Sequence, residues 1–214
     1  MVELRGAGHA AIVPRVTDVA RAQSSSFQRR ILGITGAPGV GKTTYALAQL
    51  ATSRAPAAYV PMDGFHLADV TLTALGRLDR KGAPDTFDAW GYAALLRRLR
   101  DERDHVVYAP GFERHLEQPI AGALAVQPDA DLVVTEGNYL LLDRPEWRAV
   151  REQLDEVVHL VTDDDVRRRR LVARHVEFGK TPADAQAWVA RVDDANAALV
   201  EAAAHRADRV VELT

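Results

Sequence analysis

The sequence predicts an α/β fold, with a mostly parallel sheet that carries helices on both of its faces. Short apolar runs alternate along the chain with segments of helical spacing, which is the pattern of βαβ units. The first apolar run, at 29–35, passes directly into a glycine-rich loop and then into a helical segment at 43–53. These two observations favour a five-stranded sheet within a single domain.

Strands are expected wherever a short apolar run is bounded by Gly, Pro or acidic residues. The expected strands are 29–35 (RRILGIT), 57–63 (AAYVPMD), 105–110 (HVVYAP), 131–137 (DLVVTEG) and 156–162 (EVVHLVT), and 208–213 (DRVVEL) is able to close the sheet. Because parallel strands need crossover connections, helices should lie between them.

Helices are expected between these runs. The segment 88–102 repeats leucines at helical spacing, and Asp88 is placed to cap its N-terminus. Asp163, Asp164 and Asp165 open an Arg-rich helix, at the end where the helix dipole favours acidic groups. Further helical segments are expected at 67–78 and 193–205, a loop at 79–85, and a weak helix or arm at 1–28.

The composition is that of an ordinary globular protein. A chain of 214 residues with 47% hydrophobic residues can bury one core, so one domain is expected over 29–214. The net charge of −3 lacks the basic excess of a nucleic-acid-binding protein. No apolar run approaches the ~20 residues of a membrane helix, and no secretory signal is evident. There is no cysteine for a disulfide or thiol site. We expect a cytoplasmic protein that binds neither nucleic acid nor membrane.

The stretch GAPGVGKTT at 36–44 matches the phosphate-binding loop G-x-x-x-x-G-K-[ST], with a strand before it and a helix after it. Glycines let the backbone N–H groups point at phosphate oxygens, and the helix start adds its positive end. A fortuitous glycine-rich turn would not be expected to match every position. The expected fold is therefore a P-loop NTPase-type three-layer sandwich. The residues expected to hold ATP are Gly36, Ala37, Pro38, Gly39, Val40, Gly41, Lys42, Thr43 and Thr44, with Lys42 reaching the outer phosphates and Thr43 binding Mg²⁺.

Two acidic residues follow apolar runs, at the sheet edge where ligands bind in open α/β folds. Asp63 follows AAYVPM and Glu136 follows DLVVT. One carboxylate can hold Mg²⁺ while the other accepts the proton of an attacking hydroxyl. The structural alternatives are a turn-forming Asp-Gly pair for Asp63 and a helix cap or surface acid for Glu136.

The Arg-rich helix brings Arg167, Arg170 and Arg174 onto one side, because they are spaced three and four residues apart. Guanidinium groups suit phosphate oxygens, so this side could form a lid over the phosphates, at about 164–182. A solvated helix face is the alternative.

With these segments in place, the chain resembles the branch of P-loop kinases that includes uridine kinase, bacterial pantothenate kinase and phosphoribulokinase. The matching segments are GAPGVGKTT (36–44), MDGFHL (62–67), RKGAPDTFD (80–88), VVTEGNYLLL (133–142) and RRLVARHVEFGK (169–180). The segment PGFERHLEQPI (110–120), together with EGNYLLLD (136–143) and RHVEFGK (174–180), looks most like a bacterial subgroup often labelled fructose-transport-system kinase or nucleoside/nucleotide kinase family. The resemblance covers the chain from about residue 29 to its end, and the subgroup label says little about substrate.

The resemblance implies roles for single residues. It makes Asp63 the base for the acceptor hydroxyl, places Glu136 by the magnesium and nucleotide, and makes Arg170 and Arg174 the lid arginines. It also implies an acceptor pocket, for which the candidates are Asp85, holding hydroxyls, and Phe112, Arg114 and His115. His66 stands where uridine kinases have Tyr, so it is a further candidate contact and weakens a nucleoside assignment. Nothing local requires Asn196 to approach the adenine.

The expected function is transfer of the γ-phosphate of ATP, with Mg²⁺, to a hydroxyl of a sugar, polyol or nucleoside. The expected catalytic residues are Asp63, Lys42, Arg170 and Arg174. A pantothenate-type kinase, or a nucleotide-dependent switch without a small acceptor, is the alternative. Homodimers are common among the resembling proteins, which makes a homodimer an expectation by analogy.

Overall fold

The computed structural model describes residues 28–213, and the expected arm over 1–28 lies almost wholly outside this part of the chain. The strands are β1 (Arg30–Gly36), β2 (Ala57–Tyr59), β3 (Val107–Glu113), β4 (Gln118–Val126), β5 (Leu132–Glu136), β6 (Glu156–Val161) and β7 (Arg209–Glu212). The α-helices are α1 (Lys42–Thr52), α2 (Asp69–Ala74), α3 (Ala89–Asp101), α4 (Pro145–Arg151), α5 (Asp164–Glu177), α6 (Pro182–Trp188) and α7 (Asp194–Ala202). Among the described residues, no helix is long and apolar enough to cross a membrane.

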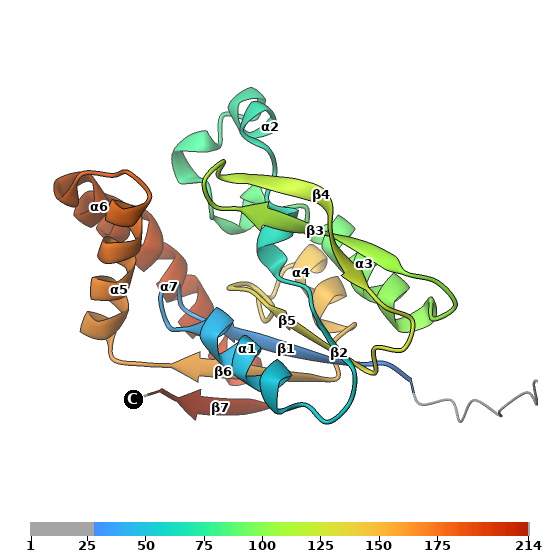
Figure 1. Ribbon diagram of the computed structural model, residues 1–214. Helices are drawn as coiled ribbons and strands as arrows, with labels where there is room; N and C mark the ends of the chain where they lie inside the picture. The colour runs from blue at the N-terminus through green and yellow to red at the C-terminus, as the bar shows by residue number, and fades with distance from the viewer. Residues whose placement is uncertain (1–27, 214) are drawn as a thin grey trace, which may run out of the picture.

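Five strands form the main sheet in the order β2-β5-β1-β6-β7, and every neighbouring pair is parallel. The predicted five-stranded parallel sheet is therefore confirmed, and 208–213 does supply its closing strand. The carboxyl ends of β1 and β5 lie side by side, since Ile34 is paired with Glu136. Figure 1 shows the five strands running through the lower half of the molecule, with α1 in front of them.

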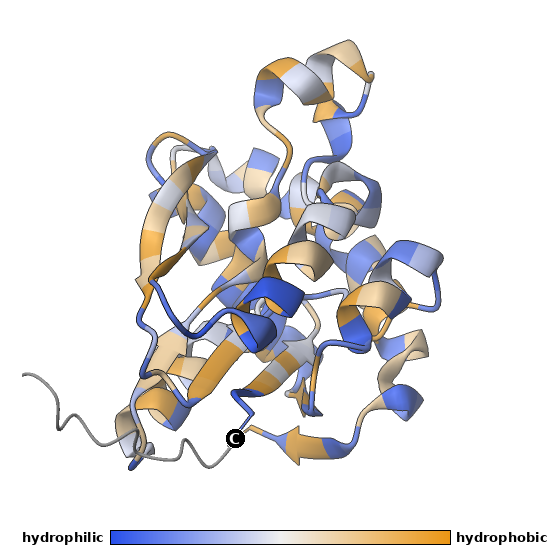
Figure 2. Cartoon of the chain, turned by 90° about the vertical axis from the view of Figure 1, so that its right-hand side faces the viewer, coloured by the Kyte–Doolittle hydropathy of each residue, from blue (hydrophilic) through white to orange (hydrophobic). Residues whose placement is uncertain are grey.

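The sheet separates two apolar layers, because successive side chains of a strand point to opposite faces. Ile31 joins the larger core beneath α3, α4 and α7, whereas Leu32 and Ile34 join the core beneath α1. Both faces of β1 are thus buried, as expected of the middle strand of a parallel sheet. The apolar colouring of these inner strands, against the mixed colouring of the helices, is visible in Figure 2.

The prediction that 105–110 is a strand of the parallel sheet is wrong. This segment begins β3, which pairs antiparallel with β4 in a separate two-stranded sheet. Residues along β3 alternate between buried and more exposed, so the strand packs on one face only. Sequence patterning missed β4, which is largely exposed and contains Pro119 and Gly122.

The predicted cap at Asp88 is confirmed, since Asp88 accepts a hydrogen bond from the backbone N–H of Gly91 at 2.8 Å. Asp163, expected among the acids that open the Arg-rich helix, also caps α5 by accepting from the N–H groups of Asp165 and Val166. The expected helix at 193–205 is longer upstream than predicted. It follows α6 through a π-helical stretch at Val189–Asp193, in which the backbone turn is wider than that of an α-helix.

Candidate active site

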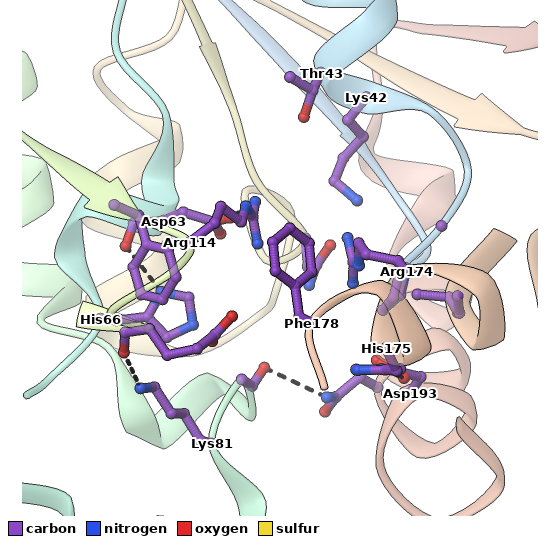
Figure 3. Close-up of a pocket in the computed structure, with 18 of the residues that line it drawn as sticks. Lys42, Thr43, Asp63, His66, Lys81, Arg114, Arg174, His175, Phe178 and Asp193 are labelled. Atoms are coloured by element: carbon purple, nitrogen blue, oxygen red, sulfur yellow. Dashed lines mark hydrogen bonds and ion pairs between the residues drawn. The ribbon is translucent and has the colours of Figure 1, made fainter. Parts of the chain in front are cut away.

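A cavity of about 540 Å³ opens at the carboxyl ends of β1, β2 and β5. One end is lined by the phosphate loop and by the first turn of α1. The other end is enclosed by the turn that carries Asp63, by the β3–β4 hairpin and by the helices α5 to α7. Figure 3 shows Lys42 and Thr43 approaching from α1, with Asp63 on the hairpin side and Asp193 on the helical side.

The loop from Gly36 to Thr43 has the backbone that a phosphate cradle needs. Gly39 has a φ of +81°, and a Cβ there would lie 2.8 Å from the carbonyl oxygen of Arg167. A Cβ at Gly36, where φ is +149°, would lie 2.5 Å from the carbonyl oxygen of Leu160. Larger residues at either position would require the backbone to move, so the curled loop depends on glycine.

Lys42 lies inside the curl of this loop. Its Nζ donates hydrogen bonds to the carbonyl oxygens of Gly36 at 3.0 Å and Ala37 at 3.1 Å. An ammonium group has three N–H donors, so one remains for a phosphate oxygen. Burial lowers the pKa of Lys42 to about 8, even though the negative charges of Glu136 and Asp63 act in the opposite direction. Lys42 thus offers a positive charge and one remaining N–H donor inside the loop, which suits the loop to polyphosphate binding.

Thr43 and Glu136 meet directly beside Lys42. The Thr43 hydroxyl donates to Oε1 of Glu136 at 3.0 Å, and the Tyr59 hydroxyl donates to the same oxygen at 2.8 Å. Burial raises the pKa of the Glu136 carboxyl, and the negative charge of Asp63 adds to this effect. Sequence analysis missed Tyr59, which lies inside the expected strand 57–63, ends the observed strand β2 and belongs to no motif.

These oxygen atoms fit a magnesium ion. Mg²⁺ prefers oxygen ligands and usually shares them between one or two protein groups, phosphates and water. Within residues 28–213 there is no group of three or more His, Asp or Glu side chains able to hold a metal by themselves. The Thr43 hydroxyl and the Glu136 carboxylate, next to a phosphate loop, could therefore supply two ligands of Mg²⁺, while phosphate oxygens of the nucleotide and water would supply the others.

Asp63 lies in a short 3₁₀ turn at Met62–Phe65 that follows β2. Its Oδ2 accepts a hydrogen bond from Nη2 of Arg114, in the hairpin, at 2.7 Å. Burial would raise the pKa of the Asp63 carboxyl, but nearby positive charge, first that of His66 and then that of Arg114 and Lys42, outweighs burial and lowers it. A Cβ at Gly64 would lie 2.3 Å from the carbonyl oxygen of Pro110, so glycine allows the turn to approach the hairpin this closely.

The predicted acceptor residues separate into two groups. His66, Phe112 and Arg114 line the cavity, and the His66 ring lies with its centroid 4.0 Å from that of Phe87 and 4.8 Å from that of Phe112. Burial lowers the pKa of His66, although Asp63 opposes this. His115 is exposed and does not line the cavity.

Asp85 is not brought to the cavity either. Its Oδ2 pairs with Nη2 of Arg80 at 2.9 Å and with Nε of Arg77 at 3.4 Å. The 3₁₀ turn at Pro84–Thr86 directs the carboxylate toward the preceding turn that carries Arg80. Arg77 and Arg80 are thus both engaged with Asp85 outside the cavity.

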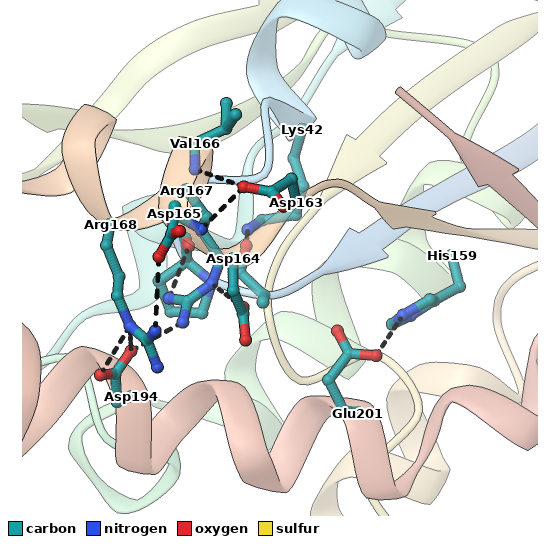
Figure 4. A network of polar contacts seen from close by, with 12 residues as sticks. Lys42, His159, Asp163, Asp164, Asp165, Val166, Arg167, Arg168, Asp194 and Glu201 are labelled. Carbon is teal, nitrogen blue, oxygen red and sulfur yellow. Dashed lines mark hydrogen bonds and ion pairs between the residues drawn. The ribbon is translucent and has the colours of Figure 1, made fainter. Parts of the chain in front are cut away.

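The three arginines expected on one side of α5 do not act alike. Arg170 and Arg174 line the cavity, and Nη1 of Arg170 donates to the carbonyl oxygen of Val40 at 3.3 Å. Arg167 is only 2% exposed and is paired with Asp164 and Asp194. Arg168 reaches the same Asp194, so the first turn of α5 is tied to the start of α7 (Figure 4). Arg167 therefore holds the helix in place.

The lysine content of the sequence indicates two cavity residues that belong to none of the predicted site residues. The chain has only three lysines, Lys42, Lys81 and Lys180, and all three line this one cavity. Lys81 Nζ is 2.6 Å from Oδ1 of Asp69, and Lys180 Nζ lies 4.5 Å from the ring centroid of Trp188. The rarity of lysine beside so many arginines could have directed attention to positions 81 and 180.

Comparisons with known proteins agree over most of the chain. The family model described as "Phosphoribulokinase / Uridine kinase family" matches residues 31–214. The uncharacterized protein YggC of Escherichia coli is 33% identical over 207 residues, covering 94% of this chain and 85% of that protein. A provisionally named uridine kinase of Schizosaccharomyces pombe, C227.14, is 34% identical over 164 residues, covering 71% of this chain and 68% of that protein.

A solved structure shares the fold. The crystal structure of a protein from Silicibacter sp. TM1040, provisionally described as a fructose transport system kinase, aligns with a TM-score of 0.79 at 38% identity. The alignment covers 86% of this chain and 90% of that one.

Proposed function

The chain belongs to the phosphoribulokinase/uridine kinase family of P-loop kinases, and on that premise we propose that it transfers the γ-phosphate of ATP to a hydroxyl of a small metabolite. A sugar or polyol is the favoured acceptor class and a nucleoside is the second. The observation that carries the proposal is that Asp63 and Lys42 face the same enclosed cavity, and that Asp63 is close enough to influence the pKa of Lys42.

The donor end of the cavity would hold ATP. The backbone N–H groups of Gly36–Thr44 would surround its phosphates, and the third N–H of Lys42 would reach the terminal one. Thr43 and Glu136 are the residues that would hold Mg²⁺, which when bound neutralises charge on the phosphate oxygens.

Asp63 would then act as the base. As the acceptor oxygen forms its bond to the γ-phosphorus, the bond from that phosphorus to the bridging oxygen breaks and ADP leaves. The acceptor proton passes to Asp63. Lys42, Arg170 and Arg174 would stabilise the charge that develops on the transferred group.

We also propose that residues 164–182, with α5 as their main part, work as a lid. Arg170 and Arg174 lie on this helix, and Phe178 at its C-terminal end lines the cavity. The Phe178 ring is 6.1 Å from that of His115 in the hairpin, so the two sides of the opening approach one another there. Closure over the acceptor would exclude water, which otherwise competes for the phosphate.

An acceptor panel tests the proposal. ADP release is measured with ATP and Mg²⁺ in the presence of D-fructose, D-ribose, glycerol, erythritol, uridine or pantothenate. We expect at least one hydroxyl compound to raise release well above the slow hydrolysis background. D-fructose is included because of the description given to the Silicibacter relative. If every compound leaves release at background, a nucleotide-dependent switch becomes the better explanation of the phosphate loop.

The variant Asp63→Asn separates chemistry from nucleotide binding. Loss of a general base typically costs roughly 10²- to 10⁴-fold in turnover. We expect a loss of this size, with ATP affinity retained because the phosphate loop is untouched. Turnover within a few-fold of the parent would show that Asp63 is not the base.

A further inference from the structure

The start of α7 places two polar side chains in the cavity to which no role has been assigned in the reaction. Asp193 ends the π-helical stretch Val189–Asp193, and Asn196 follows one turn later. Both line the cavity, and Figure 3 shows Asp193 on the side opposite the hairpin. π-helical turns are rare and often occur at functional sites, since they redirect side chains that an α-helix would point elsewhere.

Each of these side chains has one oxygen left without a protein partner. Asp193 Oδ2 lies 2.8 Å from Nε2 of His175, and Asn196 Nδ2 donates to the carbonyl oxygen of Gly82 at 3.3 Å. The second carboxylate oxygen of Asp193 and the amide oxygen of Asn196, both Oδ1, have no hydrogen-bond partner among residues 28–213.

These two oxygens are open to the cavity itself. Asp193 is 7% exposed and Asn196 is 5% exposed, so little of either side chain reaches solvent. Nevertheless, neither Oδ1 belongs to the described polar atoms that are sealed from solvent without a partner. Both residues line the cavity, so their exposed parts are within reach of a molecule bound there. Water can pair with these oxygens in the free protein, and a ligand hydroxyl that donates to them would take the place of that water.

The surrounding charges select the kind of donor. Both oxygens can accept a hydrogen bond, so an acidic group on the ligand would be repelled by Asp193. An ammonium group would meet Arg114, Lys81 and Lys180, which line the same cavity. Neutral hydroxyl groups satisfy both oxygens without either conflict.

We propose that Asp193 and Asn196 form a hydroxyl-binding subsite that selects a neutral polyhydroxylated acceptor, such as a sugar or polyol. The proposal rests on the kinase function proposed above. In this arrangement Asp63 faces the hydroxyl that is phosphorylated, while Asp193 and Asn196 accept hydrogen bonds from other hydroxyls of the same molecule. Asp193 lies close enough to influence the pKa of Lys42, as Asp63 does, so both carboxylates act near the phosphate end. The subsite supplies the role that the family resemblance implied for Asp85.

Steady-state kinetics on the acceptor panel, with Asp193→Ala and Asn196→Ala, test the subsite. We expect KM for the best sugar or polyol to rise roughly 10- to 100-fold in Asp193→Ala, the usual cost of losing a hydrogen bond to a charged group. KM for ATP should stay within about twofold, because the phosphate loop is unchanged. Asn196→Ala leaves the pair between His175 and Asp193 intact, so it checks the subsite without disturbing that contact.

Acceptors that lack one hydroxyl distinguish a binding role of Asp193 from a structural one, because only a binding role makes the effects of the two changes on the acceptor KM depend on each other. Removing from the acceptor the hydroxyl that Asp193 binds should cost the wild type roughly as much as Asp193→Ala does. The same removal should cost little more in the variant, so the two changes are not additive. D-ribose with 2-deoxy-D-ribose, and D-fructose with its monodeoxy derivatives, are suitable pairs.

Glu201→Gln is the matched control, since Glu201 lies on the same helix and is absent from the cavity lining. If an acceptor is phosphorylated but both variants keep the wild-type acceptor KM, the subsite is wrong and the kinase function stands. A best acceptor that is anionic would overturn the subsite in the same way. Background ADP release with every acceptor would instead contradict the kinase function, and the subsite with it.

Discussion

Arg114 and Asp63 form an ion pair in which Nη2 and Oδ2 are 2.7 Å apart. The guanidinium carbon also lies 5.4 Å from the ring centroid of Phe112, so the arginine has a second favourable contact within the hairpin. The proposed base is therefore held by a positive charge from a different element, one that a bound acceptor could displace. This charge also keeps the Asp63 carboxyl ionised, because it favours the charged form.

Arg114→Gln should move the acidic limb of the pH–rate profile to higher pH. Arg114 contributes to the lowering of the Asp63 pKa, so its removal raises that pKa, and a higher pH is then needed to keep the base ionised. The measurement is kcat/KM for the acceptor across the acidic range. Arg80→Gln is the control, since Arg80 pairs with Asp85 outside the cavity. Coincident acidic limbs in wild type and Arg114→Gln would contradict this account.

Lys42→Met should stabilise the nucleotide-free protein while abolishing ATP binding. Burial lowers the pKa of Lys42 from the usual 10.5 to about 8, so between these values the unfolded chain binds more protons than the folded one. The free energy of unfolding of the wild type should therefore rise with pH across this window, through this residue.

Below pH 8, the variant should be more stable by about 2 kcal/mol, a figure reduced because the Lys42 side chain as a whole is only half-buried. Urea unfolding at one pH below 8 and one between 8 and 10.5 checks the sign. The free energy of unfolding of the variant should exceed that of the wild type by less at the higher pH. A constant difference would mean that Lys42 has an ordinary pKa in the folded protein.

Glu136→Gln should weaken the response to Mg²⁺. The variant keeps the shape of the side chain but loses the negative charge that Thr43 and Tyr59 hold in place. We expect the half-saturating Mg²⁺ concentration to rise on the order of a hundredfold, and roughly tenfold in Tyr59→Phe, which keeps the carboxylate and loses only its support. Titration of turnover with Mg²⁺ at saturating ATP is the measurement. Unchanged titrations in both variants would place the metal elsewhere.

Asp85→Asn should leave the acceptor KM within about twofold of wild type, since its carboxylate is occupied by Arg80 and Arg77 and does not line the cavity. Its effect should appear in stability instead, at up to about 1 kcal/mol for a partly exposed ion pair. Acceptor kinetics and urea unfolding of the same preparation distinguish the two. A tenfold rise in acceptor KM would restore the role that the family resemblance implied.

Features that depend on neighbouring residues could be predicted from the sequence. The loop at 36–44 is recognisable because its glycines, lysine and threonine act within a single strand–loop–helix unit, and backbone freedom at those positions is local. Asp63 and Glu136 could be expected at one edge because parallel strands end at the same edge of a sheet. The caps at Asp88 and Asp163 follow the same local rule.

Tertiary structure alone decided which side chains meet across the cavity. Whether 105–110 joins the main sheet depends on a partner strand at 118–126, whose pairing no local pattern specifies. Arg167, Arg170 and Arg174 share one helix face, yet only packing against Asp194 separates the anchoring residue from the two that line the cavity. Asp193 reaches the cavity through a π-helical turn that a helical pattern cannot reveal. Backbone conformation is set mainly by adjacent residues, whereas the contacts that a side chain makes are set by distant parts of the chain packed against it.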